Sequence, residues 1–436
     1  MNRYMKYFEQ HRVEVEQRID RETERNRKSD FTLTFRDAEG NPLRGKLTVR
    51  QKTHDFKFGC NVFMLDQFPD EEHNLVYREK FPELFNYAVA PFYWSDYEVE
   101  DGKPRTGSDA PNVYRRPAPE LVLRYAAEHG IALKGHCLMW QRFLPDWLPD
   151  RPEENMFRIQ RRIREIAAEY GTRIRDFDVV NETLARKWER EYENKMPYDC
   201  TNRTFAYADT VMPGNRLFIN ETTENVWHQF RREHSAYYMQ IENLLLKGRR
   251  VDAIGLQYHI FTKQENLENR QELYLNPIRL YDVLDTYGRF DRPLHISEIT
   301  VPAFGGTEET LAEQAEMTEW LYRLWFSHES VESIVWWNFV DGTAAYAPLG
   351  SEEGENYYHG GLLSYDMGEK PVYRVLKRLI HQEWKTNVET EVNGTFTFRG
   401  FHGDYEAIFE DAHGKKTTVT FPLLKQGRRT MDIVCQ

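Results

Sequence analysis

The sequence predicts an α/β protein: a (β/α)8 barrel of the TIM type with a small accessory β-sandwich. Three observations lead to this fold class. Eight short apolar or β-branched runs alternate with helical stretches, as in successive βα units. A chain of 436 residues is long enough for one barrel with additions. Strand-like alternation of apolar and polar residues before and after the barrel region supplies the sandwich.

Four parts are expected along the chain. Residues 1–30 form a charged, weakly amphipathic N-terminal helix, and residues 31–54 form a β-hairpin around the turn Glu39-Gly40-Asn41-Pro42. Residues 387–436 alternate strictly and carry glycine turns, so they are predicted to join that hairpin in the accessory sandwich. Residues 55–386 form the barrel, whose eight strands are expected near 57–63, 85–92, 131–140, 175–182, 216–221, 251–259, 293–300 and 332–339. The sandwich is interpreted as a structural support, with carbohydrate binding as the alternative.

Composition and charge exclude several classes of partner. Hydrophobic residues make up 40% and charged residues 29%, as in ordinary globular proteins. The net charge of −12 argues against nucleic-acid binding, and no apolar stretch has the length of a membrane span. The four widely spaced cysteines predict neither a disulfide framework nor a zinc site. No metal or nucleotide motif is present, so no cofactor is expected.

The expected location is the cytoplasm. The first twenty residues are charged throughout and lack the apolar segment of a secretory signal. Widely spaced cysteines that form no pairs also suit a reducing compartment. The sequence leaves the oligomeric state open.

Polar side chains gather at the carboxyl ends of the predicted strands, where (β/α)8 barrels hold their active sites. Two of them are the carboxylates Glu182 and Glu298, at the ends of the fourth and seventh predicted strands. Burying charge is costly without partners, so two carboxylates facing one cleft indicate chemistry. Glycoside hydrolysis needs such a pair, since one carboxyl gives a proton while the other attacks or activates water. The other polar and aromatic residues at these ends include His136, Trp140, Asn181, Asn220, Glu221, Gln257, His259, Trp336, Trp337 and Asn338.

Six segments in order resemble glycoside hydrolase family 10, the xylanase-type barrels, along about residues 55–385. They are GHCLMWQRFLPDW, DVVNE, GLQYH, HISEIT, VWWNFVD and GLLSYDMGEKPVY. The resemblance implies a retaining β-glycosidase that hydrolyses β-1,4-linked xylan fragments or xylo-oligosaccharides by double displacement. In that mechanism a covalent glycosyl-enzyme intermediate forms and water then releases the sugar.

The resemblance also implies roles for particular residues. Glu182 is the proton donor, with its pKa raised so that it is protonated at rest, and Glu298 is the ionised nucleophile. His259 orients Glu298, and Asn181 binds the sugar 2-OH. The two carboxyl groups are expected about 5–5.5 Å apart, the retaining separation. The implied substrate-binding residues are His136, Trp140, Asn181, Gln257, His259, Trp337, Trp94 and Tyr346.

Several positions depart from the family pattern. Where the family carries Glu-Asn-x-x-Lys-Trp on the second strand, this chain has Val89-Ala90-Pro91-Phe92-Tyr93-Trp94, so only the tryptophan remains. Gln141 replaces the second histidine of the third-strand motif, and Ile299-Thr300 follow the nucleophile. Tyr346 stands in the loop where the family has a covering tryptophan. We therefore expect intact cleavage machinery with rebuilt contacts to the sugars on the non-reducing side.

Alternatives to this interpretation remain open. A β-glycosidase of the same fold that acts on another sugar, or on a glycosylated small molecule, shares the mechanism but not the substrate. A catalytically idle carbohydrate-binding barrel is the third hypothesis, and the retention of both glutamates argues against it. His136 has a rival interpretation as a structural histidine bonded to Asp178, and the two can coexist. The sequence leaves chain-length preference, branch tolerance and endo or exo action undecided.

Overall fold

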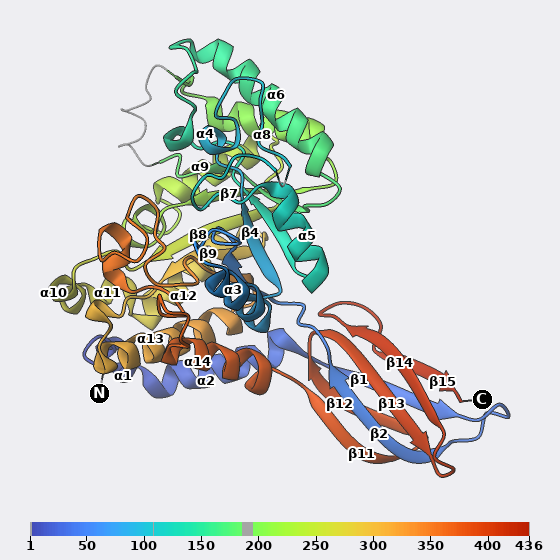
Figure 1. Cartoon of the computed structure of the whole chain (residues 1–436). Helices are drawn as coiled ribbons and strands as arrows, with labels where there is room; N and C mark the ends of the chain where they lie inside the picture. The colour runs from blue at the N-terminus through green and yellow to red at the C-terminus, as the bar shows by residue number, and fades with distance from the viewer. Residues whose placement is uncertain (1, 108, 185–194, 436) are drawn as a thin grey trace.

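The computed structural model describes residues 2–107, 109–184 and 195–435. Eight strands at its centre are β3 (Lys57–Asn61), β4 (Tyr87–Pro91), β5 (Ala132–His136), β6 (Asp176–Asn181), β7 (Arg216–Glu221), β8 (Ala253–His259), β9 (Leu294–Thr300) and β10 (Val331–Trp336). They close into a parallel barrel in the order β10-β3-β4-β5-β6-β7-β8-β9. Figure 1 shows the barrel beside a second group of strands. Each barrel strand overlaps one predicted segment, so the predicted (β/α)8 barrel is confirmed.

The barrel strands are apolar and β-branched because parallel strands in such folds are covered on both faces. In β6 and β8 every residue is buried. Polar residues within them, such as Asp178 and Gln257, therefore need polar partners inside the protein. Those partners gather toward the carboxyl ends of the strands, where the candidate site lies.

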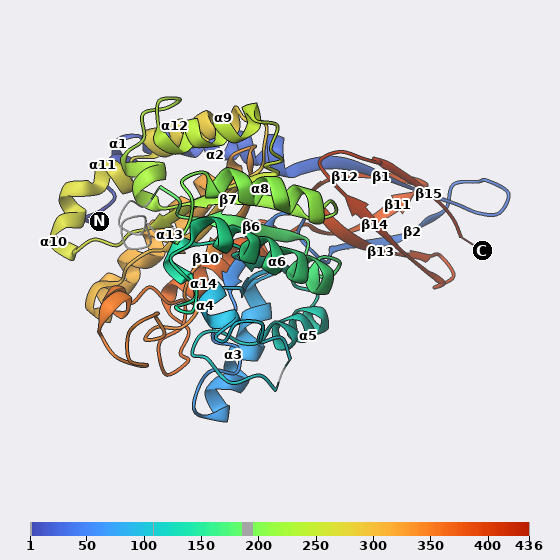
Figure 2. The same cartoon turned by 90° about the horizontal axis from the view of Figure 1, so that it is seen from above.

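Helices surround the barrel (Figure 2). In α6 (Pro152–Tyr170), apolar residues at helical spacing, including Ile159, Ile163 and Ile166, are buried, and a proline stands at the start of the helix. The longer barrel helices are α3 (Glu71–Leu84), α5 (Pro119–His129), α6 (Pro152–Tyr170), α8 (Cys200–Val211), α9 (Ala236–Leu246), α12 (Pro277–Gly288), α13 (Glu308–Ser327) and α14 (Pro371–Arg378). Among the described residues, no helix combines the length and apolar character needed to cross a lipid bilayer.

Short helical turns occupy the connections between these elements. The turns of α-helix are α4 (Trp94–Tyr97), α10 (Gln264–Leu267) and α11 (Gln271–Tyr274). The 3-10 or π turns are η1 (Gln141–Phe143), η2 (Glu224–His228), η3 (Glu268–Arg270), η4 (Phe304–Gly306), η5 (Gly354–Tyr358) and η6 (Leu379–Glu383). Several of them, including η1, η2 and η5, contribute residues to the cleft described below.

The N-terminal segment forms α1 (Lys6–Gln10) and α2 (Arg12–Arg27), which lie along the outside of the barrel. α2 packs against α13, and the side-chain amide of Asn26 donates to the carbonyl of Ser327 at 2.9 Å. Arg27 donates to carbonyl groups that follow α13 and begin β10. These contacts join the first helices to α13 and to the start of β10.

Seven further strands form the accessory sheet: β1 (Lys28–Arg36), β2 (Arg44–Gln51), β11 (Asn387–Asn393), β12 (Thr395–Phe401), β13 (Gly403–Asp411), β14 (Lys416–Leu423) and β15 (Thr430–Val434). Their order is β14-β13-β2-β11-β12-β1-β15. β11 and β12 pair at a single position, Asn393 opposite Thr395, and the sheet folds there into two layers. Phe35 stacks on Phe409, with ring centroids 4.4 Å apart, across the layers. The predicted sandwich is present, but the predicted hairpin over residues 31–54 was wrong. Beyond a single bridge between Arg36 and Pro42, β1 and β2 do not pair with each other, because C-terminal strands occupy both edges of each.

The sandwich adjoins the amino-terminal end of the barrel. A pocket between the two parts is lined by Lys57 and Glu332, at the starts of β3 and β10, and by Phe401 and His402 of the sandwich. The carboxyl ends of the strands lie at the opposite end of the barrel, so the sandwich leaves that face open.

Candidate active site

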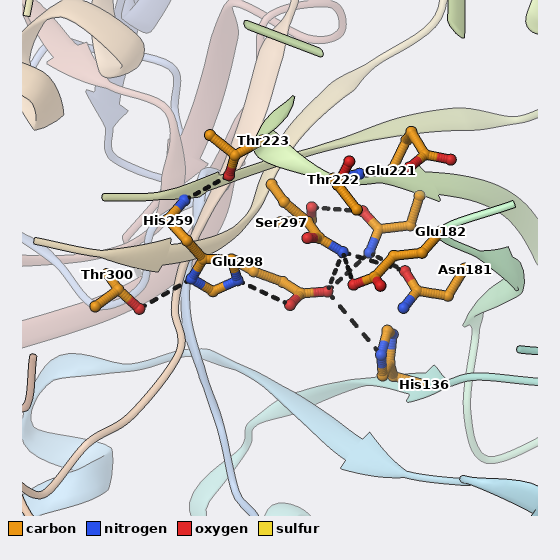
Figure 3. Close-up of polar contacts among 12 residues, drawn as sticks. His136, Asn181, Glu182, Glu221, Thr222, Thr223, His259, Ser297, Glu298 and Thr300 are labelled. Carbon is orange, nitrogen blue, oxygen red and sulfur yellow. Dashed lines mark hydrogen bonds and ion pairs between the residues drawn. The ribbon is translucent and has the colours of Figure 1, made fainter. Parts of the chain in front are cut away.

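A cleft of about 340 Å³ lies at the carboxyl ends of the barrel strands. Both glutamates singled out from the sequence line it. The predicted residues that line it are Trp140, Glu182, Gln257, His259, Glu298, Trp337 and Tyr346. His136 and Asn181 lie beside the two glutamates in Figure 3, whereas Trp94 is not part of the cleft lining.

Glu298 lies within β9 and is 4% exposed. Its Oε1 accepts hydrogen bonds from the side-chain amides of Asn220 at 2.8 Å and Gln257 at 3.1 Å. Its Oε2 lies 3.2 Å from Nε2 of His259, whose Nδ1 lies 2.9 Å from the hydroxyl of Thr300 (Figure 3). Three donors or donor-bearing side chains around one carboxyl group fix its orientation in the cleft.

Glu182 directly follows β6 and adopts a left-handed backbone conformation, with φ of 52°. Non-glycine residues rarely adopt this conformation, and those that do are frequent at functional sites. Burial, together with the negative charge of Glu298, raises the pKa of Glu182 to about 8. Glu298 and Glu182 thus have different environments: the first is held by amide donors, and the second is favoured in its protonated form.

The amide of Gln257 connects the two carboxylates. Its Nε2 lies 3.1 Å from Oε1 of Glu182 and 3.1 Å from Oε1 of Glu298. These two oxygens therefore lie no farther apart than the sum of two such contacts, and both face the same space. The same Nε2 lies 3.3 Å from Oδ1 of Asn181.

Asn220, the last residue but one of β7, completes this network. Its side-chain amide donates to Oδ1 of Asn181 at 2.8 Å as well as to Glu298, and its oxygen accepts from the hydroxyl of Ser297 at 2.5 Å. A Cβ at Gly255 on the neighbouring strand would overlap the Asn220 side-chain oxygen. Glycine at that position therefore makes room for the Asn220 side chain.

His136 lies in a buried group of charged residues at the end of β5. Its Nδ1 is 2.7 Å from Oδ2 of Asp178, and the ammonium of Lys134 is 2.9 Å from the same oxygen. The structural contact to Asp178 considered from the sequence is thus present. The other ring nitrogen, Nε2, lies 4.0 Å from Oε1 of Glu298 and has no hydrogen-bond partner. One histidine therefore connects a structural ion pair to the cleft.

Aromatic rings form the walls of the cleft. Trp337 lies edge-on to His136 and His259, with ring centroids 5.6 Å and 6.2 Å apart. On another wall, the ring centroid of Trp140 lies 4.8 Å from that of Phe143. Tyr346 stacks on Phe143 and is 70% exposed at the mouth of the cleft. Such rings offer flat apolar faces to a sugar.

Trp94 occupies a different place from the one its motif suggested. It is buried in α4, its indole N–H donates to Oε2 of Glu98 at 2.8 Å, and its ring lies edge-on to Trp147. The preceding residue, Tyr93, lines the cleft instead. Trp94 therefore packs α4 against the interior, and Tyr93 forms part of the cleft wall.

A third buried carboxylate, Glu221 at the end of β7, does not line the cleft. It accepts hydrogen bonds from the backbone N–H groups of Thr222 at 2.8 Å and Leu184 at 3.0 Å, and from the Asn225 amide at 3.1 Å. Burial raises its pKa. Glu221 therefore fixes the segment that follows Glu182, and both of its carboxylate oxygens accept hydrogen bonds from within the protein.

The cleft also contains residues that the sequence analysis did not identify. They include Tyr93, Arg115, Arg116, Phe143, Thr223 and Phe261. Arg115 and Arg116 come from the long connection between α4 and α5, where no periodic pattern marks a residue for the site. Their one signal in the sequence is an adjacent arginine pair in an otherwise uncharged stretch, VYRRPAP. Among the described residues, no group of three or more His, Cys, Asp or Glu side chains is arranged as a metal site.

Comparison with known proteins places this cleft in context. Endo-1,4-beta-xylanase 1 of Arabidopsis thaliana is 24% identical over 94% of this chain and 39% of its own length. Endo-1,4-beta-xylanase 3 of the same plant is 24% identical over 89% of this chain and 47% of its own length. The chain thus spans less than half the length of these curated relatives.

Solved xylanase structures share the barrel. Native xylanase 10B of Thermotoga maritima gives a TM-score of 0.58 at 20% identity, covering 76% of this chain and 96% of that one. Xylanase 10B of Thermotoga petrophila, in complex with xylobiose, gives 0.58 at 19% identity, covering 76% and 95%. At these identities the likeness shows the fold alone.

The family itself is established by a model of the whole group rather than by any one relative. The model for glycosyl hydrolase family 10 matches residues 100–374, more than half of the chain. This range contains all six segments whose resemblance was noted from the sequence, and it includes Glu182 and Glu298. The protein belongs to glycosyl hydrolase family 10.

Proposed function

We propose that the protein is a retaining β-glycosidase of xylanase type, which hydrolyses β-1,4-linked xylan fragments or xylo-oligosaccharides. The observation that carries this proposal is the pair of 3.1 Å contacts from one amide, that of Gln257, to both Glu182 and Glu298. Two carboxyls that share one donor face the same bond of a substrate. Membership of the family, and relatives named endo-1,4-beta-xylanase, support the choice of substrate class.

In the first step Glu298 is the nucleophile. The amides of Asn220 and Gln257 hold one carboxylate oxygen, and His259 contacts the other, so the group is oriented before substrate arrives. Its attack on the anomeric carbon forms a glycosyl ester while the glycosidic C–O bond breaks.

Glu182 is the acid in that step. A pKa of about 8 keeps it protonated at neutral pH, ready to give its proton to the departing oxygen. Part of that elevation comes from the charge of Glu298, which is lost once the ester forms. The pKa of Glu182 then falls, and the resulting carboxylate removes a proton from the water that hydrolyses the ester. Proton and charge return to their starting places.

Retention of anomeric configuration is supported by the closeness of the two carboxyls. Inverting enzymes leave room for a water, with carboxyl groups about 6.5–9.5 Å apart, whereas retaining enzymes place them about 5–5.5 Å apart. The shared Gln257 donor keeps the two facing oxygens within the sum of two 3.1 Å contacts, which favours the retaining range.

Sugar recognition is supported by polar atoms that lack partners within the protein. Nδ2 of Asn181, Nε2 of His136 and Nε1 of Trp140 are buried beside the cleft and make no hydrogen bond to any described residue. Leaving buried polar atoms unpaired is costly, so such atoms suit ligand hydroxyls, which both donate and accept. We assign Asn181 to the 2-OH and Trp140 and Trp337 to the faces of the sugar.

A second candidate is a β-glycosidase of the same mechanism that acts on another sugar. One observation favours keeping it. Where the family pattern has an asparagine and a lysine on the second strand, this chain has Ala90 and Tyr93, and two arginines enter the cleft from a different segment. An idle binding barrel is disfavoured, because a binding site has no need for a proton donor poised beside an oriented carboxylate.

The first test is product analysis on xylotetraose, with and without glucuronyl or arabinosyl branches. Wild-type protein should release shorter xylo-oligosaccharides, and the first-formed anomer should keep the β configuration. Lack of hydrolysis of every xyloside, alongside release from another nitrophenyl glycoside, would move the assignment to the second candidate. An α anomer as first product would contradict retention.

A pair of variants then separates the two glutamates. With an activated nitrophenyl substrate and azide, Glu298→Ala should give the inverted glycosyl azide, because azide occupies the place of the missing nucleophile. Glu182→Ala should give the retained azide, because azide there attacks the glycosyl-enzyme. Exchange of the two products would reverse the roles, and near-normal turnover of Glu298→Ala would remove the nucleophile assignment.

A further inference from the structure

Two adjacent arginines enter the cleft from the connection between α4 and α5. Arg115 is 3% exposed and Arg116 is 7% exposed, yet both line the cleft. Arg115 has a left-handed backbone conformation, with φ of 61°, which is unfavourable for a residue with a side chain. Burying two arginines, one of them with a strained backbone, costs folding free energy. Such a cost indicates a functional role in the cleft that the pair lines.

Arg115 lacks a carboxylate partner. Its Nη1 donates to Oδ1 of Asn338 at 3.0 Å and to the carbonyl of Thr343, while its Nε has no hydrogen-bond partner. None of the ion pairs within residues 2–107, 109–184 and 195–435 includes Arg115. Burial and the neighbouring Arg116 lower the pKa of Arg115, and the charge of Glu355 opposes that effect only from beyond ion-pair distance.

Arg116 differs from Arg115 in having an acidic partner. Its Nε donates to Oδ2 of Asp96 at 2.7 Å, and its guanidinium carbon lies 3.9 Å from the ring centroid of Tyr93. Asp96 thus compensates one of the two positive charges and leaves the other without a close counter-charge. A guanidinium is a fork of donors that matches a carboxylate, and an unpaired buried one is a site for an anion.

The position of the pair relates it to the reacting groups. The ring of Tyr93 contacts both Arg116 and His136, and its centroid lies 5.3 Å from that of the His136 ring. Nε2 of His136 in turn lies 4.0 Å from Oε1 of Glu298. Asn338, which accepts from Arg115, directly follows Trp337 of the cleft wall. A sugar lying against Tyr93 and Trp337 would therefore present its substituents to the arginines.

We propose that Arg115, with Arg116 beside it, binds the carboxylate of a uronic acid unit, so that the enzyme prefers acidic xylo-oligosaccharides over neutral ones. This inference rests on the proposed function and adds a specificity site to it. The net charge of −12 repels anions from the molecule as a whole, so capture of an acidic sugar needs a local positive group of this kind.

The test uses a matched pair of substrates: xylotriose carrying one glucuronic acid branch, and the same molecule with its carboxyl reduced to a hydroxymethyl group. Wild type should show a kcat/KM for the acid about ten-fold or more above that for the reduced form, as a charge-assisted hydrogen bond predicts. Added salt should reduce that ratio. Arg115→Gln should bring the ratio close to one, and Arg115→Lys should fall between.

Arg105→Gln is the control for damage to the loop. Arg105 is a buried arginine of the same segment, bonded to the carbonyls of Pro111, Asp96 and Arg116, and it does not line the cleft. Its substitution should leave the acid-to-neutral ratio as in wild type, whatever happens to the absolute rates. Equal rates of wild type on both substrates, or equal loss on both in Arg115→Gln, would overturn the proposal while leaving the hydrolase assignment intact.

Failure of the proposed function would be distinct. If wild type hydrolysed neither molecule, calorimetry with the same two oligosaccharides would still compare their binding. Tighter binding of the acid that disappears in Arg115→Gln supports the arginine site without hydrolysis. Equal binding, or absence of binding for both, rejects it.

Discussion

The side-chain amide of Asn220 donates to Oε1 of Glu298 at 2.8 Å. The contact joins the ends of β7 and β9, two strands that lie on either side of β8 in the barrel. Asn220 thereby adds a third fixed partner to a carboxylate that Gln257 and His259 also hold. A glutamate held in this way does not have to be reoriented when substrate binds.

Asn220→Ala should lower kcat more than it raises KM. Removing a hydrogen bond to a charged group costs about 1.5–3 kcal/mol, or roughly ten- to a hundred-fold in rate where the bond acts in the transition state. Steady-state kinetics on xylo-oligosaccharides measures this. Asn215→Ala is the control, because Asn215 precedes the other end of β7 and bonds the carbonyls of Gly171 and Ile174. It should lose stability without that loss of kcat, and parallel losses in both variants would contradict the assignment.

The pH dependence should reveal Glu182. Burial and the charge of Glu298 raise its pKa to about 8, and the reaction needs its protonated form, so kcat/KM should fall as pH rises through about 8. In Glu182→Gln, with a nitrophenyl substrate that needs no acid, this alkaline limb should disappear. A limb that persists unchanged in the variant would assign it to another group.

Lys134→Met should destabilise the fold strongly. Lys134 and Asp178 are both buried, and losing one partner of such a pair costs about 3–5 kcal/mol, which urea unfolding can measure. Burial alone would raise the pKa of Asp178, but Lys134 and His136 outweigh it and hold the pKa below its ordinary value. The pair therefore adds stability above the unfolded pKa of about 3.9, and the difference between variant and wild type should shrink as pH falls below it.

Lys52→Met offers the comparison for that substitution. Lys52 is 56% exposed in its ion pair with Glu406, so its loss should cost less than about 1 kcal/mol. Similar destabilisation by the two methionine substitutions would show that the buried pair contributes no more to the free energy of unfolding than the exposed one.

Gly255→Ala should act through Asn220. The added methyl group overlaps the Asn220 side-chain oxygen and must displace it from Glu298 and Ser297. We expect a loss of kcat similar to that of Asn220→Ala, with the double variant little worse than either single one. A kinetic double-mutant cycle measures this coupling. Additive losses would show that the glycine serves something else.

The barrel could be predicted because its strands are covered on both faces. Such strands appear in the sequence as short apolar runs, and β6 and β8 are clear instances. Glu182, Glu298, Gln257 and His259 stood out because polar residues at the ends of these runs have few structural explanations. The strand order of the sandwich could not be predicted from the sequence, because β2 pairs with β11 and β13, which lie more than 300 residues away in the chain.

The parts of the cleft that escaped prediction lie where regular patterns end. Trp94 was expected at the sugar because its motif contains it, but in the short turn of α4 adjacent side chains point in different directions. Tyr93 lines the cleft, whereas Trp94 points into the interior and donates a hydrogen bond to Glu98. Arg115 lies in an irregular connection, whose path depends on packing against Asn338 and Thr343, both distant in sequence.

The mixed origin of the sandwich has a consequence for how the protein is made. β1 and β2 leave the ribosome before any part of the barrel, yet their neighbours in the sheet are β12, β15, β11 and β13, all within residues 387–434. Throughout synthesis of the barrel, phenylalanines such as Phe31 and Phe35 lack the rings they stack on. Nascent chains should therefore complete the barrel first. Until the C-terminal strands are made, β1 and β2 stay unpaired, bind chaperones and are prone to aggregation.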